Sequence, residues 1–217
     1  GFIGRHLIKV MPEIHLSSRR LTRPRIIYLS SVGANLNSAD LYERRKAQDE
    51  ALLRLTKDTD VVIMRPTIVY GPEGGPPQQS FYRWLRLVKR GHAYWFGEPA
   101  WANYLYVDDL ITALLRAVTM PPGTYTVADP ISLHEFLTLI AEETSPHILP
   151  RWLGRATATL GDVGRSRFWN MRRYWALTNP NCFRTSAELV SEGWTPRIGH
   201  AEGLRRTRDW LRKEHQL

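Results

Sequence analysis

Two short apolar segments separated by a helical segment constrain the fold of this chain more than any other feature. Residues 26–29 and residues 61–64 are rich in β-branched side chains and lead into turns, as buried strands do. Residues 40–55 between them are rich in strong helix formers, with Asp40 placed to cap the helix. Strand, helix and strand in this order predict a parallel βαβ unit.

The chain beyond residue 70 predicts a second, smaller lobe. Residues 70–79 are rich in glycine and proline, which is typical of a loop. Residues 81–90 have the apolar and basic pattern of an amphipathic helix, and Gly91 is a normal helix terminator. Further along, the sequence predicts a helix over residues 110–118, a strand over residues 125–127, and a helix to Ile140 that opens with a capping box of Ser132 and Glu135.

Composition excludes several classes of protein. Hydrophobic residues make up 43% of the chain and charged residues 24%, as in an ordinary soluble globular protein. The longest apolar runs, such as residues 61–64, are far shorter than the roughly 20 residues that cross a bilayer, so we expect no transmembrane segment. Cys182 is the single cysteine and cannot form an internal disulfide, which favours a reducing compartment, the cytoplasm.

The formal net charge of +9 would suit contact with nucleic acid, an anionic membrane face or an acidic subunit. The basic residues are scattered through helical segments, however, and such scatter favours solvated faces, so we expect no nucleic-acid partner. Residues 146–175 are unusual because they mix tryptophans with arginines. They predict either an interfacial helix on a membrane or partner surface, or a lobe core of packed aromatic rings from which the arginines reach solvent.

The first four residues are the candidate for a phosphate-binding turn. Gly1, Phe2, Ile3 and Gly4 match what remains of a dinucleotide fingerprint when its first glycine is removed. In such a turn, glycines let the backbone approach a pyrophosphate, whose charge is held by the N-terminus of the next helix. Because the chain opens in the middle of this motif, we expect it to lack the start of its protein.

Tyr42 and Lys46 form the candidate catalytic pair. They lie four residues apart on the expected helix, so their side chains share one face. A nearby ammonium favours the phenolate and lowers the pKa of the tyrosine. Such a group suits proton transfer to or from an alcohol and carbonyl pair.

The order of the motifs carries a family resemblance. GFIG is followed by YLSS at residues 28–31, YxxxK at residues 42–46, RPTIVYGP at residues 65–72, YVDDL at residues 106–110 and GWTP at residues 193–196. This succession resembles the extended short-chain dehydrogenase/reductase family, which includes nucleotide-sugar epimerases, dehydratases and hydroxysteroid dehydrogenases. The resemblance covers nearly the whole chain, apart from residues 11–23 and 146–175.

The resemblance implies an α/β fold, a Rossmann-like doubly wound parallel sheet with a smaller C-terminal substrate lobe. Residues 1–72 would form the dinucleotide-binding part, and residues 73–217 mostly the substrate lobe, with some elements returning to the first part. Family members carry several more strands and helices before the YLSS strand, where only residues 9–25 are available here. We therefore expect the N-terminal part to be incomplete. The choice between NAD and NADP, which that region would decide, is unreadable.

The resemblance also assigns roles to residues. Tyr42 would be the acid/base, and Lys46 would bind the nicotinamide ribose while tuning Tyr42. Ser31 would assist catalysis, or would be a structural hydroxyl at a strand end. Asp108 and Asp109, at the entrance to a helix, are expected to be capping and structural. The expected cofactor-binding residues, besides Tyr42 and Lys46, are Gly1, Phe2, Ile3 and Gly4 at the phosphates and Pro66, Thr67, Ile68 and Val69 behind the nicotinamide.

Two functions follow from the resemblance. The first is an NAD(P)-dependent oxidoreductase or epimerase that acts on an alcohol or carbonyl of a small molecule and forms a homodimer or a larger assembly. The second is a non-catalytic NAD(P)H-binding subunit, like the accessory subunit of respiratory complex I that keeps a bound NADPH; it would be mitochondrial. Val32, where sugar epimerases carry a further hydroxyl, and the short distance from Ser31 to Tyr42 point to such atypical members. No metal site is expected.

Overall fold

The computed structural model describes residues 2–10, 23–74, 76–92, 94–96, 100–142, 146–166, 170–171, 174–175, 178 and 180–214. These residues form two compact units. Unit 1 comprises Gly1–Glu73, Tyr104–Asp129 and Phe183–Gly199, and unit 2 comprises Gly74–Asn103, Pro130–Cys182 and His200–Leu217. The assignment of cofactor binding to residues 1–72 and of substrate binding mostly to residues 73–217 stays a prediction.

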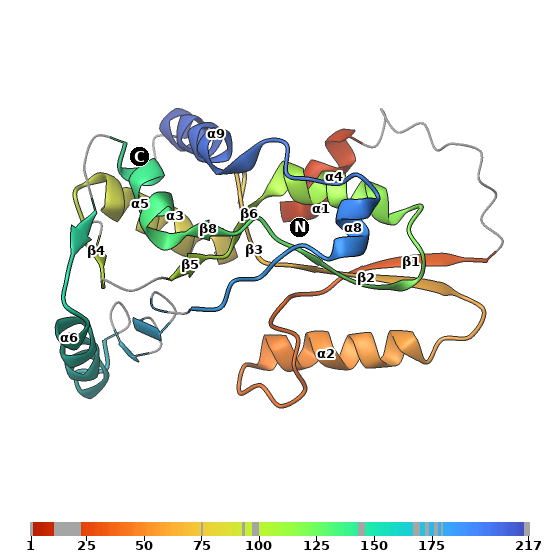
Figure 1. The fold of residues 1–217 in the computed structure, drawn as a ribbon, viewed down its shortest axis with the longest axis horizontal. Coiled ribbons are helices and arrows are strands. Elements are labelled where there is room, and N and C mark those ends of the chain that lie inside the picture. The colour runs from red at the N-terminus through yellow and green to blue at the C-terminus, as the bar shows by residue number, and fades with distance from the viewer. Residues whose placement is uncertain are drawn as a thin grey trace. The chain divides into compact units, whose positions relative to one another are not determined.

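A parallel three-stranded sheet lies at the centre of unit 1 (Figure 1). Its strands are β1 (Arg25–Leu29), β2 (Asp60–Pro66) and β7 (Gly123–Val127), in the order β1-β2-β7. Helix α2 (Leu41–Arg54) connects β1 to β2, which pair in parallel from Arg25 with Asp60 to Leu29 with Met64. The expected βαβ unit is therefore confirmed, and the Asp40 side chain caps α2 by accepting the backbone N–H of Tyr42 at 2.8 Å.

Helices lie on both faces of this sheet (Figure 1). Helix α4 (Val107–Ala117) contacts β2 on one face, where α1 (Phe2–Val10) packs on α4, and α2 contacts β2 on the other face. The buried core of unit 1 lies on the α4 side, where Leu110 and Trp194 pack with Val62 and Met64. Two shorter strands, β3 (Ile68–Tyr70) and β6 (Tyr104–Tyr106), pair in parallel, and α8 (Ala187–Ser191) adds Leu189 to the core.

Unit 2 is built mainly from helices. Its elements are α3 (Pro76–Lys89), β4 (Tyr94–Trp95), β5 (Trp101–Ala102), β8 (Ile131–Ser132), α5 (Leu133–Ala141), β9 (His147–Ile148), α6 (Arg151–Val163) and most of α9 (Gly199–Lys213). The serine half of the expected capping box is confirmed at the start of α5, because Ser132 Oγ accepts the backbone N–H of Glu135 at 3.1 Å. No helix among the described residues is long and apolar enough to cross a membrane.

Two element boundaries differ from those expected. Residues 76–79 belong to α3 rather than to a loop, because proline is compatible with the first helical turn, where backbone N–H groups lack partners in any case. Helix α4 begins at Val107 instead of residue 110, so Asp108 and Asp109 lie in its first turn.

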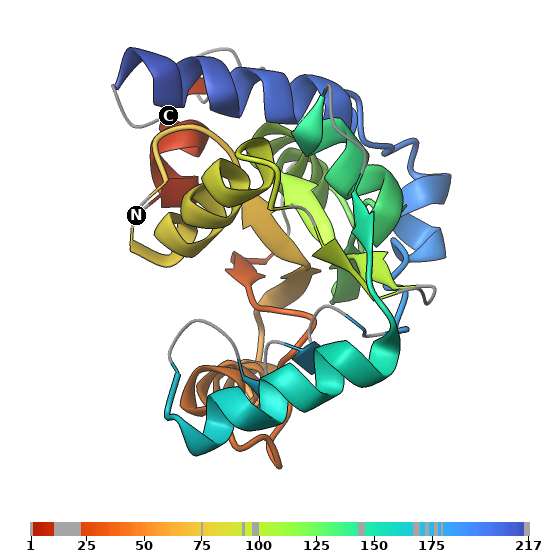
Figure 2. The ribbon, with the colours of Figure 1, turned by 90° about the vertical axis from the view of Figure 1, so that its left-hand side faces the viewer.

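Residues 146–175 divide between the two readings of that segment. Helix α6 (cyan in Figure 2) packs on Phe96 and Tyr174 through Ala158, so an aromatic core is confirmed for Tyr174. Trp152 is 70% exposed and Trp175 is also exposed, so the expectation that the aromatic rings of this segment fill a core is wrong for both. Residues 167–169 and 172–173 lie outside the described residues.

Candidate active site

The glycine motif lies at the start of a helix. Gly1 is outside the described residues, whereas Phe2, Ile3 and Gly4 form the first turn of α1, so a loop conformation is wrong for these three. A helix N-terminus still offers unpaired N–H groups and a positive dipole end to a phosphate. A Cβ added at Gly4 would meet nothing within 4 Å, so the space beside this turn is open.

His6 connects α1 to two other parts of unit 1. Its buried ring places Nδ1 3.1 Å from Asp108 Oδ1 and Nε2 3.1 Å from the carbonyl oxygen of Pro72. A carbonyl only accepts, so Nε2 is the nitrogen that donates there. The first turn of α1 is thereby held against α4 and the turn that follows β3.

The two aspartates at the start of α4 are structural, as expected, although Asp109 acts on another helix. The Asp109 carboxylate is buried and accepts the backbone N–H groups of Arg197, Ile198 and Gly199 at 2.8, 3.0 and 3.1 Å. These residues lead into α9, so Asp109 caps a helix that lies far away in sequence. Asp108 holds His6.

Tyr42 and Lys46 lie one turn apart on α2, and the lysine reaches the end of β1. Lys46 Nζ donates to the carbonyl oxygen of Leu29 at 2.6 Å and to Tyr28 Oη at 3.3 Å. The same ammonium lies 5.8 Å from the centroid of the Tyr42 ring, and Tyr42 is 57% exposed. The pair is therefore on one helix face, but the lysine is engaged by the backbone of the YLSS motif.

The pKa values in this region differ from the expected ones. Partial burial raises the pKa of Tyr42, so the expectation that Lys46 lowers it is wrong. Burial also lowers the pKa of Lys46, and this effect exceeds the opposing influence of the Asp49 and Glu50 carboxylates. The sequence reasoning missed Tyr28, whose hydroxyl donates to Asp49 Oδ2 at 2.6 Å.

The two serines of the YLSS motif have different roles. Ser31 Oγ accepts the backbone N–H of Gly33 at 3.2 Å, which forms a local turn after β1. Ser30 is buried and donates to Glu50 Oε1 at 2.5 Å. Ser30 thus links the end of β1 to α2, while the proposed catalytic role of Ser31 stays a prediction.

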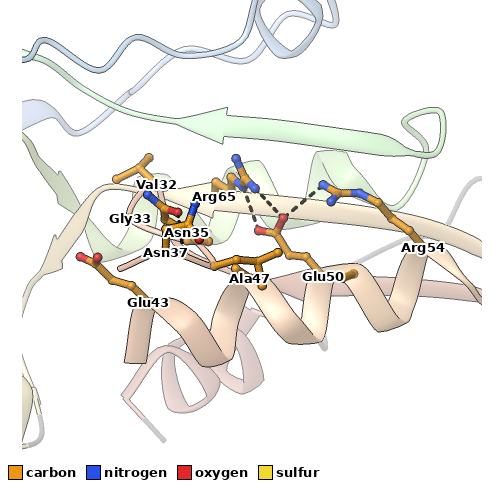
Figure 3. Close-up of a pocket in the computed structure, with 12 residues that line it drawn as sticks. Val32, Gly33, Asn35, Asn37, Glu43, Ala47, Glu50, Arg54 and Arg65 are labelled. Carbon is orange, nitrogen blue, oxygen red and sulfur yellow. Dashed lines mark hydrogen bonds and ion pairs between the residues drawn. The ribbon is translucent and has the colours of Figure 1, made fainter. Parts of the chain in front are cut away.

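Glu50 is the buried centre of a polar cluster that the sequence reasoning missed (Figure 3). Arg65 of β2 donates to its two carboxylate oxygens at 2.8 and 2.5 Å, and Arg54 donates at 3.1 Å. Arg54 also donates to Thr124 of β7 at 3.0 Å. Burial acts to raise the pKa of Glu50, but hydrogen bonds from Arg65 and Ser30 outweigh it and hold the pKa below its usual value. We name Ser30, Glu50, Arg54 and Arg65 the Glu50 cluster; it connects α2 to β2, to the residue that follows β1 and, through Arg54, to β7.

A polar cavity of about 640 Å³ opens between α2 and the loop after β1 (Figure 3). Its lining from the loop is residues 32–37, and its lining from α2 and β2 is Glu43, Ala47, Glu50, Ala51, Arg54 and Arg65. Tyr42 and Lys46 are not among the described residues that line it. Their neighbours Glu43 and Ala47 do line it, so the cavity lies beside the candidate catalytic pair.

The segment expected behind the nicotinamide begins at the carboxyl end of β2. Pro66 is buried as the last residue of that strand, Ile68 is exposed, and Val69 is half-buried in β3. Thr67 is buried, and its Oγ1 has no hydrogen-bond partner among the described residues. A buried hydroxyl without a partner is unfavourable unless a bound group satisfies it. This orphan hydroxyl and the open space beside Gly4 fit a dinucleotide.

Comparisons with known proteins agree with this geometry. A family model described as the NAD dependent epimerase/dehydratase family matches residues 18–128, more than half of the 217 residues. UDP-glucose 4-epimerase of Mycolicibacterium smegmatis is 26% identical in an alignment of 201 positions that covers 87% of this chain and 58% of that protein.

Solved structures show the same fold. UDP-glucose 4-epimerase from Thermotoga maritima with UDP-glucose has a TM-score of 0.59 at 18% identity, covering 88% of this chain and 64% of that one. UDP-glucuronic acid 4-epimerase from Bacillus cereus in complex with NAD has a TM-score of 0.54 at 15% identity, covering 87% of this chain and 60% of that one. This chain thus spans less than two thirds of each of the three relatives. The Rossmann-like α/β fold is confirmed, and the chain belongs to the NAD-dependent epimerase/dehydratase family.

Proposed function

We propose that this chain carries the proton-transfer residues of an NAD(P)-dependent enzyme that oxidises and reduces an alcohol carbon of a nucleotide sugar, as an epimerase does. The observation that supports it most is the Tyr42 and Lys46 pair on one face of α2, with Lys46 bound to Leu29 O at the carboxyl end of β1. Ligands of open α/β sheets bind at the carboxyl ends of parallel strands. The sugar nucleotides bound or converted by the relatives named above support the substrate class.

In this proposal Tyr42 moves the proton. In the reduction of a carbonyl intermediate, Tyr42 is the acid that donates to the carbonyl oxygen, and its raised pKa agrees with a protonated phenol at neutral pH. The reverse step, in which Tyr42 takes a proton from an alcohol, requires the phenolate to be stabilised, and Lys46 is the cation within reach. Bound NAD or NADP supplies the hydride acceptor and donor.

The cofactor would be held by residues that the structure leaves available. The first turn of α1 offers its N–H groups to the phosphates, and Thr67 Oγ1 offers a hydroxyl near the end of β2. Lys46 would bind the ribose, and Pro66, Ile68 and Val69 would back the nicotinamide ring. The proposal takes either NAD or NADP as the cofactor. It also includes a cytoplasmic location and a homodimer.

The test is Tyr42→Phe, which removes the phenolic proton and retains the ring. We expect turnover of a UDP-sugar to fall by at least about 100-fold, as for loss of a general acid/base, while dinucleotide binding is retained. Turnover is measured by the conversion of UDP-glucose and bound dinucleotide by mass spectrometry of the native protein. Tyr94→Phe, at another exposed tyrosine, is the matched control and should retain activity.

Full turnover in Tyr42→Phe would remove Tyr42 from the proposed role. A wild-type protein that retains a dinucleotide but converts no sugar would instead support the non-catalytic subunit, which the comparisons do not favour.

A further inference from the structure

Helix α6 carries an exposed apolar stripe. Trp152, Leu160 and Val163 are 70%, 69% and 80% exposed, and Ala156 between them is also exposed. At roughly 100° per residue, these four positions fall within about 80° of the helix circumference. Exposed apolar side chains gathered in this way mark interaction sites rather than scattered surface residues.

The opposite face of α6 packs against other residues of unit 2, so the helix cannot rotate to bury the stripe. Gly154 lies so close to Phe96 and Tyr174 that a Cβ at this position would overlap the Phe96 ring. Ala158 is fully buried in the same cluster. Figure 2 shows α6 as an unbroken helix, so the inner and outer faces keep their orientation over its whole length.

The segment that carries the stripe is rich in arginine. Residues 146–175 contain six arginines and one acidic residue, Asp162, which accepts the backbone N–H of Met171 at 3.3 Å. Arg155 is exposed on the flank of the stripe, and Arg151 is exposed at the start of the helix. A second copy of this chain would bring the same positive charge to the contact, which disfavours self-association through this face.

We propose that the outer face of α6 docks on a membrane surface that contains anionic lipid. Trp152, Leu160 and Val163 would enter the boundary between headgroups and acyl chains, and Arg155 would contact anionic headgroups. Interfacial helices combine an apolar face that includes tryptophan with basic residues in this way. The helix would lie in the plane of the surface and would not span it.

Co-sedimentation with vesicles tests the proposal. The intact protein is mixed with vesicles of phosphatidylcholine, with and without phosphatidylglycerol, at low and high salt. We expect binding to the anionic vesicles alone, weakened by salt because the arginine contribution is screened. Trp152→Glu should lower the vesicle affinity by more than about tenfold, because it removes the largest apolar group and adds a negative charge.

Two further variants have matched controls elsewhere in the chain. Leu160→Gln should weaken vesicle binding, whereas Leu52→Gln, at a similarly exposed leucine of α2, should leave it unchanged. Arg155→Gln should weaken binding by about fivefold, from roughly 1 kcal/mol per basic residue near the surface. Lys57→Gln removes an equal charge outside α6 and should have no effect.

The folding of each variant is checked by circular dichroism, and Leu160→Gln carries the test if Trp152→Glu does not fold. The proposal is overturned if the wild type binds no vesicles, or if Trp152→Glu and Leu160→Gln bind as well as the wild type. It is also overturned if the stripe variants abolish a dimer, or a complex with an acidic protein, while lipid binding is absent.

Discussion

Helices α2 and α4 cover opposite faces of the same sheet but are attached to it by different chemistry. Helix α4 buries five residues, including Leu110, Ile111 and Leu114, in the apolar core. Helix α2 buries only Ala47 and Glu50 and leaves Leu41 and Leu52 exposed. Hydrophobic packing is not directional, whereas hydrogen bonds to a carboxylate have a fixed geometry. The helix that carries Tyr42 and Lys46 is thus the one held by directional bonds.

The largest expected effect comes from removing the centre of the Glu50 cluster. Glu50→Ala leaves the guanidinium groups of Arg65 and Arg54 without their shared carboxylate, and we expect the free energy of unfolding to fall by about 3–5 kcal/mol. Denaturant unfolding measures this. Leu110→Ala in α4 should destabilise by a similar amount, about 2–5 kcal/mol, through a cavity. A near-neutral Glu50→Ala would mean that α2 does not depend on its polar attachment.

Acid should weaken the attachment of α2 through Glu50 and leave the apolar packing of α4 unchanged. Because the folded-state pKa of Glu50 lies below its ordinary value of 4.5, its contribution to stability is complete above pH 4.5. That contribution is lost as the pH falls through the folded-state pKa. Unfolding measured below pH 4.5 should therefore show a steeper loss for the wild type and for Leu110→Ala than for Glu50→Gln, which has no carboxylate to protonate. Equal slopes in all three would contradict this.

A smaller effect is expected at the start of α2. Asp40→Ala removes the side chain that accepts the N–H of Tyr42, and loss of an N-cap costs about 1 kcal/mol. Asp40→Asn keeps an acceptor and should retain most of the stability. Thermal unfolding distinguishes the two variants. If both melt like the wild type, the cap does not help to fix the first turn of α2.

Local patterns were sufficient for much of the fold and insufficient for the contacts that hold α2. The strands around α2 and the N-caps at Asp40 and Ser132 depend on neighbouring residues, so the sequence predicts them. Glu50 and Arg65 are 15 residues apart and look like surface charges, so only the packing of α2 on β2 reveals their pairing.

The expectation that Trp152 is buried is wrong for a different reason. A large aromatic residue is expected to be buried, but the face of α6 that packs inward is set by Gly154 and Ala158, whose small size permits close approach. The expectation of a lowered pKa for Tyr42 is wrong because Lys46 donates to a backbone carbonyl of β1 and does not bind the phenol.

The capping of residues 197–199 by Asp109 has a consequence for synthesis on the ribosome. Unit 1 is assembled from the first, middle and last portions of the chain, and Leu189 and Trp194 complete its core. Until residue 199 has left the exit tunnel, the Asp109 carboxylate lacks its three backbone donors and the core lacks these two side chains. The nascent chain therefore exposes an unfinished sheet unit while residues 130–182 of unit 2 are translated, which makes it a substrate for chaperones that bind apolar surfaces.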